Sequence, residues 1–538
     1  IPWRRDHVEM FDFHCDVPEG TDAIDVALGI TLATSTSGFS SGASASANLT
    51  VLNWNQLVVY PKGPAISAIT CKPSVRLPAG WKVASALTVA KHQDNVAQFA
   101  PVPLDTLVDS PVLCGVHLRD VPLVTVDGRA HSIAIVCETA AGLEISPAVK
   151  GNLDQLVIES GKLFGARHYK QYKFLLTLSD QVAHFGLEHH ECSDDRTSEN
   201  ALIDDNIKKG LGATLLPHEY VHSWNGKYRR PADMITPTFQ EPQRTKLLWV
   251  YEGLTQYLGT VLAARSGLWT PEQFRDNLAT VALWAQNQKG REWRPLEDTT
   301  VAAQLLYYTR PDWGAYRRSV DFYDEGILLW LEVDTLIREK TKGKRSLDDF
   351  CQRFHGGKHG PATVKGFDFD EVVADLNAVV AYDWKTYWVT RLTATDKNAP
   401  LKGIERGGWK LAFAAKPSAL QSVREEDDKE IDLTASLGMN LSNEGKVIDV
   451  IPGLPAHKAG VGPGMKVIAV NSRRFSEKGL RAAVAATKIA KDHLELLVEN
   501  GEFFRVLPID YHSGARFAVL ERTAGTEDVL SAICQARK

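Results

Sequence analysis

The sequence is poor in cysteine, has no excess of basic residues and contains no long apolar run. Its seven cysteines are scattered and none forms a C-x-x-C pair, which argues against a thiolate zinc site and leaves room for only a few disulfides. The 61 basic residues are fewer than the 66 acidic ones, so no positive surface for nucleic acid is expected. No stretch reaches the roughly 18 uninterrupted apolar residues of a membrane span. We therefore expect neither a nucleic-acid partner nor a membrane span.

The length and composition are those of a soluble protein with several domains. With 538 residues, 44% of them hydrophobic, the chain has material for three or four domains of about 150 residues each. It begins at Ile1 rather than at a methionine, which fits the removal of a leader as well as a trimmed sequence. We expect a periplasmic or secreted location.

Changes in local pattern divide the chain into five segments and predict a multidomain α+β fold. Residues 1–150 alternate short apolar runs with Gly, Pro, Ser and Asp, which predicts a β-sandwich-like N-terminal domain, whereas 151–395 show longer helical patterns and predict a mainly helical domain. Residues 396–430 end in a charged run and are interpreted as a connector with a solvated loop. Residues 431–515 predict a small α+β domain, and 516–538 a C-terminal extension.

Individual elements follow from periodicity and turn residues. Strands are predicted at 23–28, 56–60, 132–137, 172–178, 446–451, 465–470 and 494–498, helices at 247–265, 327–339 and 476–490, and a flexible surface loop at 35–47.

The residues that point most clearly to chemistry are His218, Glu219 and His222, in the pattern H-E-x-x-H. On a helix, positions i and i+4 share a face, so the two histidines are placed to bind one zinc ion. Glu219 is placed to take a proton from water that the metal activates. The alternative is two surface histidines on an amphipathic helix. Pro217 indicates that the helix begins or kinks there, because proline is tolerated only in the first turn.

A catalytic zinc site needs a third protein ligand and an open position. The best candidate is Glu252, 30 positions after His222, on an aromatic-rich helix but not on its apolar face. A solvated glutamate is the alternative reading. Glu241 is a rival, but it lies in a Pro/Gln/Arg-rich stretch that is typical of a loop. The sequence thus predicts one Zn²⁺ per chain, bound by His218, His222 and Glu252.

At these residues the chain resembles the gluzincin peptidases and, more narrowly, the glycyl aminopeptidase family. The matching positions after the histidine motif are Trp224, Asn225, Lys227, Arg230 and Pro231. The resemblance follows nearly the whole chain and implies an N-terminal β domain, a thermolysin-like catalytic domain and a C-terminal PDZ domain.

The resemblance also implies roles for residues in two further motifs. The segment from Phe185 to His189 is similar to a family motif whose glutamate, here Glu188, holds the α-ammonium group of the substrate, although Phe185 stands where the family has glycine. The segment around Tyr323 is similar to one whose tyrosine stabilises the tetrahedral intermediate. Without the resemblance, the histidine- and glutamate-rich stretch 184–191 reads as a solvated loop or a second metal site, and Tyr323 as a packed tyrosine.

The segment 431–515 resembles a PDZ domain through Ser436–Leu441, which is like a carboxylate-binding loop, and through 455–460 and 462–471, which are like the PDZ core. Such domains bind a peptide or a chain terminus as an added strand. Packing against the catalytic domain is the open alternative.

The sequence therefore predicts a zinc aminopeptidase that removes N-terminal glycine or alanine from peptides with a free N-terminus. The alternatives are a zinc endopeptidase, and a PDZ peptide-binding or chaperone-like protein with a vestigial zinc site. Lys227, Arg229 and Arg230 follow the metal motif and are assigned either to a substrate carboxylate or to capping the helix.

Overall fold

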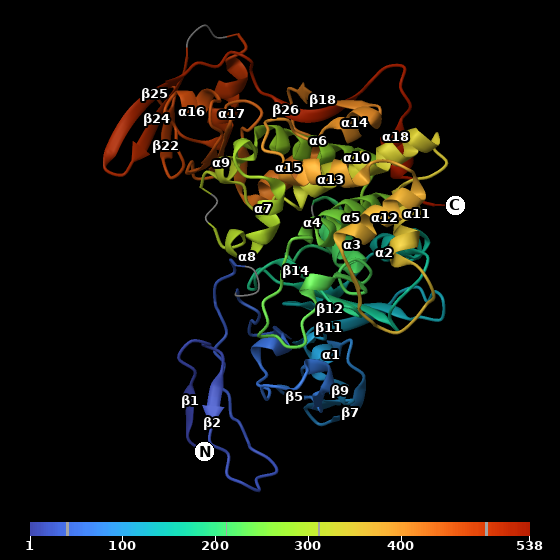
Figure 1. Cartoon of the computed structure of the whole chain (residues 1–538). Coiled ribbons are helices and arrows are strands. Elements are labelled where there is room, and N and C mark those ends of the chain that lie inside the picture. Colours follow the sequence, from blue (N-terminus) through green and yellow to red (C-terminus); the bar gives the residue numbers. More distant parts are fainter. Residues whose placement is uncertain (39–41, 211, 310–311, 490–492, 538) are drawn as a thin grey trace.

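The computed structural model describes residues 1–538 except 39–41, 211, 310–311, 490–492 and 538. Figure 1 shows a β-rich N-terminal unit with an extended arm at one end of the molecule, a helical body in the middle, and a small α+β unit at the other end. The C-terminus returns to the helical body. Among the described residues, no helix is long and apolar enough to cross a membrane.

The N-terminal unit is built from short antiparallel strands. They are β1 (Trp3–Arg5), β2 (Phe13–Cys15), β3 (Leu49–Leu52), β4 (Thr70–Cys71), β5 (Ser74–Arg76), β6 (Lys82–Ser85), β7 (Val89–Gln93), β8 (Val96–Phe99), β9 (Val102–Pro103) and β10 (Val112–Gly115). The short helix α1 (Leu104–Val108) connects β9 to β10. The central strand β10 lies between β3 and β6, and its alternate side chains enter two cores: Leu113 faces one, while Val112 and Cys114 face the other. The β-rich character predicted for this region is confirmed.

Two strand predictions in this unit are wrong, and a predicted surface loop is partly buried. Residues 23–28 alternate like a strand but pair with no other described strand, and their apolar side chains are exposed. Residues 54–56 form a 3₁₀ turn, so no strand occupies 56–60. The predicted surface loop 35–47 contains the buried residues Ala43 and Ser44, which pack beside β3; its positions 39–41 lie outside the described residues.

A five-stranded sheet supports the helical body. It contains β11 (Leu118–Pro122), β12 (His131–Cys137), β13 (Tyr172–Leu178), β15 (Cys192–Thr197) and β14 (Phe185–Glu188), in this spatial order. The three inner strands are parallel, and helix α2 (Pro147–Phe164) connects β12 to β13. The predicted strands 132–137 and 172–178 are confirmed. A domain boundary at 150 would cut this sheet, because β12 pairs with β11 on one side and with β13 on the other.

The rest of the body is mainly helical. Its elements are α3 (Gly212–His222), β16 (Arg229–Pro231), α4 (Leu248–Tyr251), α5 (Gly253–Ser266), α6 (Pro271–Asn287), α7 (Leu296–Val301), α8 (Ala303–Leu306), α9 (Gly314–Arg317), α10 (Asp324–Thr341), α11 (Leu347–His355), β17 (Lys365–Phe367), α12 (Phe369–Val379) and α13 (Trp384–Thr393). The predicted helix 327–339 lies within α10. The helix predicted over 247–265 is interrupted at Glu252, between α4 and α5.

Glycines allow three of these helices to meet closely. A Cβ atom on Gly259 of α5 would come within 3.1 Å of the His218 Cα atom on α3. A Cβ atom on Gly326 of α10 would come within 2.5 Å of the Gly253 Cα atom on α5. The N-terminal ends of α5 and α10 and the face of α3 therefore converge, which brings Glu252, Tyr323 and the two histidines together.

The segment predicted as a connector is folded onto the body. It contains α14 (Lys402–Arg406), β18 (Trp409–Ala414) and α15 (Ala419–Asp428), and β18 pairs with β26 (Phe517–Arg522) of the predicted C-terminal extension. This two-stranded sheet packs on α6, and α18 (Val529–Ile533) buries Leu530 and Ile533 in the main core. The charged run is helical rather than a solvated loop, because Leu420 is buried and Arg424 hydrogen-bonds Asn277 of α6.

The α+β unit has its own core. Its elements are β19 (Glu430–Asp432), β20 (Met439–Ser442), β21 (Val447–Val450), α16 (Pro455–Lys458), β22 (Lys466–Val470), β23 (Arg473–Arg474), α17 (Glu477–Ala486), β24 (Leu494–Asn500) and β25 (Phe503–Ile509). Strand β20 lies between β19 and β21, and the second sheet has the order β23-β22-β24-β25. The unit contacts the body where the Asp449 carboxylate accepts a hydrogen bond from the Ala315 amide, 3.0 Å away.

Candidate active site

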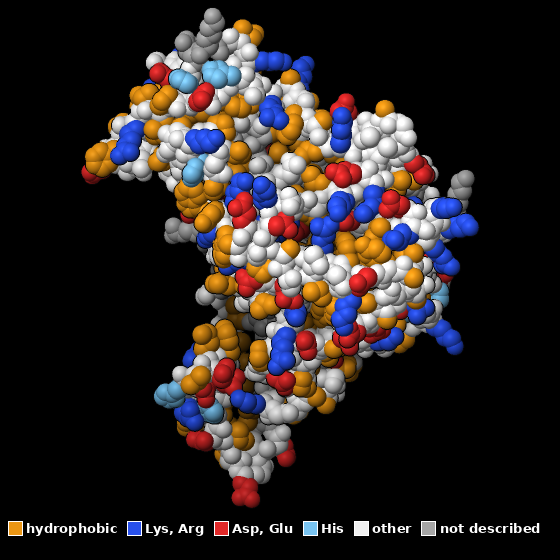
Figure 2. All heavy atoms as spheres, turned by 45° about the horizontal axis from the view of Figure 1, so that its top comes forward, with side chains coloured by type: hydrophobic (Ala, Val, Ile, Leu, Met, Phe, Trp, Pro, Cys, Tyr) orange, Lys and Arg blue, Asp and Glu red, His pale blue; other side chains and the backbone are white. Residues whose placement is uncertain are grey.

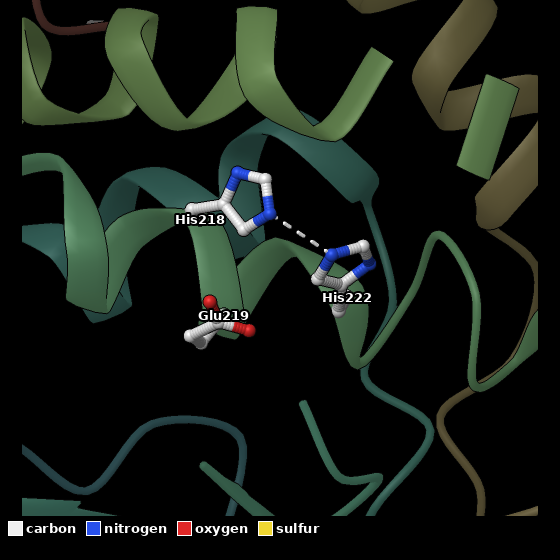
Figure 3. A group of neighbouring side chains, drawn as sticks. All are labelled: His218, Glu219 and His222. Carbon is white, nitrogen blue, oxygen red and sulfur yellow. Dashed lines mark hydrogen bonds between the residues drawn. The ribbon is translucent and has the colours of Figure 1, made fainter. Parts of the chain in front are cut away.

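The three predicted metal ligands converge on one point. His218 and His222 lie one turn apart on α3, and Figure 3 shows their Nε2 atoms facing each other, 3.1 Å apart. The Glu252 Oε2 atom lies 3.5 Å from the Nε2 atom of His218 and 3.2 Å from that of His222. All three side chains are largely buried. The rival Glu241 is exposed and lies in no helix or strand.

This triangle fits a zinc ion. Ligand atoms about 2.0–2.1 Å from a tetrahedral zinc ion lie about 3.3 Å from one another, and the three observed separations bracket that value. The Glu252 Oε2 atom is buried and accepts no hydrogen bond from any described residue. Burial raises the pKa of Glu252, but the two imidazoles outweigh it and lower the pKa, so this carboxylate is ionised. Two imidazoles and one carboxylate form the donor set of a catalytic zinc site.

The surroundings of His222 fix its ring for metal binding. Its Nδ1 atom donates to the Asn225 carbonyl over 2.9 Å, so its Nε2 atom carries the lone pair that faces Glu252. The Asn225 amide in turn donates to the carbonyls of Val250 and Tyr251, on the segment just before Glu252. The asparagine after the histidine motif thus links the two segments that carry the predicted ligands.

Helix α3 begins at Gly212 rather than at Pro217, which lies inside it.

Glu219 lies beside the two histidines, on a neighbouring face of α3 (Figure 3). One of its carboxylate oxygens lies within 4.8 Å of a ring nitrogen of each histidine. Burial, reinforced by the carboxylate of Glu188, raises the pKa of Glu219 well above its ordinary value. Gly186 of β14 faces it, and a Cβ atom there would come within 2.0 Å of the Glu219 Oε1 atom. The glycine therefore leaves the space that this carboxylate fills.

Glu188 lies at the end of the edge strand β14, on the same face as Gly186. The Tyr251 hydroxyl donates to the Glu188 Oε1 atom over 2.5 Å. Burial raises the pKa of Glu188, but His222 and Lys227 outweigh it and lower the pKa. Phe185 belongs to the opposite face of the strand, where the Arg196 guanidinium lies 4.3 Å from its ring centre. The phenylalanine that replaces the family's glycine is thus directed away from Glu219.

Tyr323 immediately precedes α10, and its ring centre lies 6.1 Å from that of His218. Its hydroxyl oxygen lies 2.5 Å from that of Tyr307, a residue that sequence reasoning missed because no motif surrounds it. Burial raises the pKa of Tyr323 well above 10, so the phenol remains protonated.

The basic residues after α3 are bound within the protein. Lys227 donates to the Asp109 Oδ1 atom over 2.9 Å, and Arg229 to the Glu371 Oε1 atom over 2.6 Å. Arg230 donates to the carbonyl of Gly226. Lys227 and Arg229 thus pair with carboxylates of the protein rather than with the carbonyl groups at the end of α3, and a role in binding a substrate carboxylate stays a prediction. Asp109, which comes from the N-terminal unit, was also missed, since its partners are far away in the sequence.

The histidine-rich stretch after β14 is folded rather than solvated. His189 and His190 are both buried, and the carboxylate of Asp109 contacts the ring of His189 and the amide of His190. Within the described part of the chain, these histidines join no group of three metal-binding side chains, so a second metal site there is not supported.

Comparisons with known proteins match two segments of the chain to family models. A family model described as M61 glycyl aminopeptidase matches residues 212–329, and one described as the peptidase M61 N-terminal domain matches residues 1–116. No curated protein matches the sequence.

Three solved structures are similar to the chain. A protein of the aminopeptidase N family from Idiomarina loihiensis is 19% identical with a TM-score of 0.73, over 91% of this chain and 83% of its own, which shows a shared fold. The M1 zinc metallopeptidase of Deinococcus radiodurans is 14% identical with a TM-score of 0.44, over 68% of this chain and 74% of its own. The leukotriene A4 hydrolase of Saccharomyces cerevisiae is 13% identical with a TM-score of 0.39, over 64% of this chain and 49% of its own.

Proposed function

This chain belongs to the M61 glycyl aminopeptidase family, and from that membership we propose that it is a zinc-dependent aminopeptidase that removes small N-terminal residues from peptides. The observation that carries the proposal is the triangle of His218, His222 and Glu252, with Glu219 beside it. Glu188 lies on the same strand as Gly186, which faces Glu219. The preference for N-terminal glycine or alanine is carried over from the family.

His218, His222 and Glu252 are proposed to bind the zinc ion, which supplies Lewis-acid polarisation of the scissile carbonyl. Glu219 takes the proton of the attacking water and returns it to the leaving amine. Its position beside the two histidines suits both steps, because a general base must lie within reach of the proton that it transfers. No second base is needed within this arrangement.

Tyr323 is proposed to stabilise the developing oxyanion. Its hydroxyl remains protonated, and its ring centre lies 6.1 Å from that of His218. A protonated phenol donates a hydrogen bond to negative charge without losing its own proton. The contact with Tyr307 orients this hydroxyl.

Glu188 is proposed to bind the α-ammonium group of the substrate. Its carboxylate is ionised, and the Tyr251 hydroxyl fixes one of its oxygens, which leaves the other for a charge-assisted hydrogen bond. A fixed carboxylate next to the metal ligands places the first peptide bond at the reacting centre and excludes later ones. This is the feature that favours an aminopeptidase over an endopeptidase.

The peptide-binding alternative receives less support. We retain a PDZ-like assignment for residues 431–515 as a proposal, on the resemblance of Ser436–Leu441 to a carboxylate-binding loop. Both edges of β20, the strand after this loop, are paired, with β19 and with β21. An added peptide strand at β20 would first have to displace β19.

Release of glycine and alanine from their amides tests the proposal. We expect hydrolysis that a chelator abolishes and added Zn²⁺ restores, and no hydrolysis of the N-acetylated amides. Undiminished cleavage after metal removal would disprove the metallopeptidase mechanism. Equal cleavage of free and acetylated substrates would instead favour an endopeptidase.

A further inference from the structure

A second group of potential metal ligands lies in the α+β unit, on the hairpin formed by β24 and β25. His493 immediately precedes β24, and Asp510 and His512 follow β25, so all three lie at the same end of the hairpin, next to the paired residues Leu494 and Ile509. Figure 2 shows histidine and acidic side chains gathered on the exposed end of this unit. We propose that these three residues bind a divalent transition-metal ion.

The distances suit a single ion. The Asp510 Oδ1 atom lies 3.2 Å from the His512 Nε2 atom and 3.9 Å from the His493 Nδ1 atom, and all three ligand atoms lie within 4.8 Å of one another. Separations of about 3.3 Å are those of neighbouring ligands around a tetrahedral zinc ion, so a small rotation of the exposed His493 ring completes the site. Two imidazoles favour zinc, nickel or copper over calcium or magnesium. Water fills the remaining positions, because all three residues are exposed.

The proposed ion would join the two ends of the hairpin. A metal bound by residues on both strands stabilises the paired form, since the unfolded chain does not hold the ligands together. This site shares no residue with the one on α3 and does not depend on the peptidase proposal.

Calorimetric titration with Zn²⁺ tests this site on the full chain after its first zinc ion has been loaded and excess metal removed. We expect one further ion to bind to the native chain and none to the double variant His493→Gln/His512→Gln. His92→Gln, a single exposed histidine of the N-terminal unit, is the matched control and should bind like the native chain. Absence of further binding to the native chain, or undiminished binding to the double variant, would overturn the proposal.

A separate observation concerns Asp109, which the N-terminal unit places against the helical body. Its Oδ1 atom accepts from Lys227 over 2.9 Å and contacts the His189 ring over 3.3 Å, and its Oδ2 atom accepts from the His190 amide over 2.8 Å. The Ser223 hydroxyl, one residue after α3, donates to the His190 carbonyl over 2.7 Å. The turn that directly follows Glu188 is therefore fixed from two sides.

We infer that Asp109 is a positioning residue for Glu188. It holds the turn at 189–190 and keeps Lys227 in place. The charge of Lys227 lowers the pKa of Glu188. The Asp109–Lys227 pair is mostly shielded from solvent, with side chains 27% and 13% exposed, so salt weakens it little. The N-terminal unit thereby contributes to recognition of the substrate's amine. This inference rests on the proposed function.

Inhibition by glycine hydroxamate and by acetohydroxamate, which differ in the α-amine, tests this role. Both reach the metal, but only the first engages Glu188, so the ratio of their inhibition constants reports the amine site. We expect Asp109→Asn to reduce that ratio by about tenfold, with acetohydroxamate inhibition unchanged. Asp109→Glu, which keeps the negative charge, should reduce the ratio less than Asp109→Asn does. Asp105→Asn, one turn earlier on α1, is the control and should leave the ratio unchanged.

The outcomes separate the two claims. If the native chain hydrolyses amides and Asp109→Asn leaves the ratio unchanged, or weakens both inhibitors equally, the positioning role is wrong while the peptidase proposal remains. If the native chain neither hydrolyses amides nor binds either hydroxamate, the proposed function is wrong and the positioning role is lost with it.

Discussion

The helices that carry the proposed metal ligands and the loop that carries the two tyrosines face the same site but are built differently. The ligands lie on or next to α3 and α5, which pack closely at Gly259, and His222 is only 1% exposed. The tyrosine loop, residues 307–323, is described except for 310–311. It begins at Tyr307, which is 38% exposed, and contains two non-glycine residues in the left-handed region, Trp313 and Arg318.

The two regions are also held by different forces. Apolar packing and backbone hydrogen bonds fix the helices. The loop depends on polar contacts: Arg318 forms ion pairs with Asp321 and Glu325, and the Asp449 carboxylate of the α+β unit accepts from the Ala315 amide. The proposed metal binding therefore rests on the packed core, whereas the proposed oxyanion stabilisation rests on a region that a second unit contacts. The effects of substitutions in the two regions should therefore differ in the property that is affected as well as in magnitude.

The largest expected effect is that of removing a ligand. Glu252→Ala leaves two imidazoles, which are too few for a tight zinc site, so we expect loss of both bound zinc and activity. Metal analysis after dialysis, together with amide hydrolysis, measures this. Glu241→Ala, the exposed rival, should keep both. A Glu252 variant with full zinc content would show that the ligand set has been assigned wrongly.

Glu219→Gln should separate metal binding from chemistry. The amide has the same shape but cannot accept the proton of water, so kcat should fall by about 10²- to 10⁴-fold while zinc content stays at the native level. Thermal unfolding checks that the fold is unchanged. A variant that keeps more than a tenth of the native kcat would assign the base to another residue.

The helices that carry the proposed ligands are also the part of the candidate site whose geometry the sequence indicates most directly. His218 and His222 are four positions apart, so helix geometry alone places their side chains on one face. The interruption at Glu252 was not predicted, because the apolar spacing of α4 and α5 is continuous. Tyr307 was not found at all, since only the path of the tyrosine loop brings it to Tyr323.

The same contrast holds for the fold. Elements that depend on local spacing were predicted, whereas pairings between distant segments were not. Strand β13 and the core of α10 were predicted from their own residues. The pairing of β18 with β26 joins segments about a hundred residues apart, and nothing in either segment indicates its partner. For the same reason residues 396–430 were interpreted as a connector.

Tyr323→Phe tests the tyrosine loop directly. Loss of the hydroxyl removes one oxyanion donor, so kcat should fall by about 10²- to 10³-fold with zinc content and KM nearly unchanged. Steady-state kinetics on alanine amides measures the split. Tyr316→Phe, an exposed tyrosine of the same loop, is the control. A rise in KM alone would place Tyr323 in substrate binding instead.

Tyr307→Phe should have the smallest effect and is the sharpest probe of the difference between the two regions. Tyr307 acts on Tyr323 through one hydrogen bond, so its loss should lower kcat about twofold to tenfold, the range expected for a net contribution of about 0.5–1.5 kcal/mol. Tyr308→Phe, the exposed neighbour, should match the native chain. In a Tyr323→Phe background, Tyr307→Phe should have no further effect, because the hydroxyl that it orients is already absent. Additive losses would mean that Tyr307 contacts the substrate itself, and the loop would then contribute two donors rather than one donor and its support.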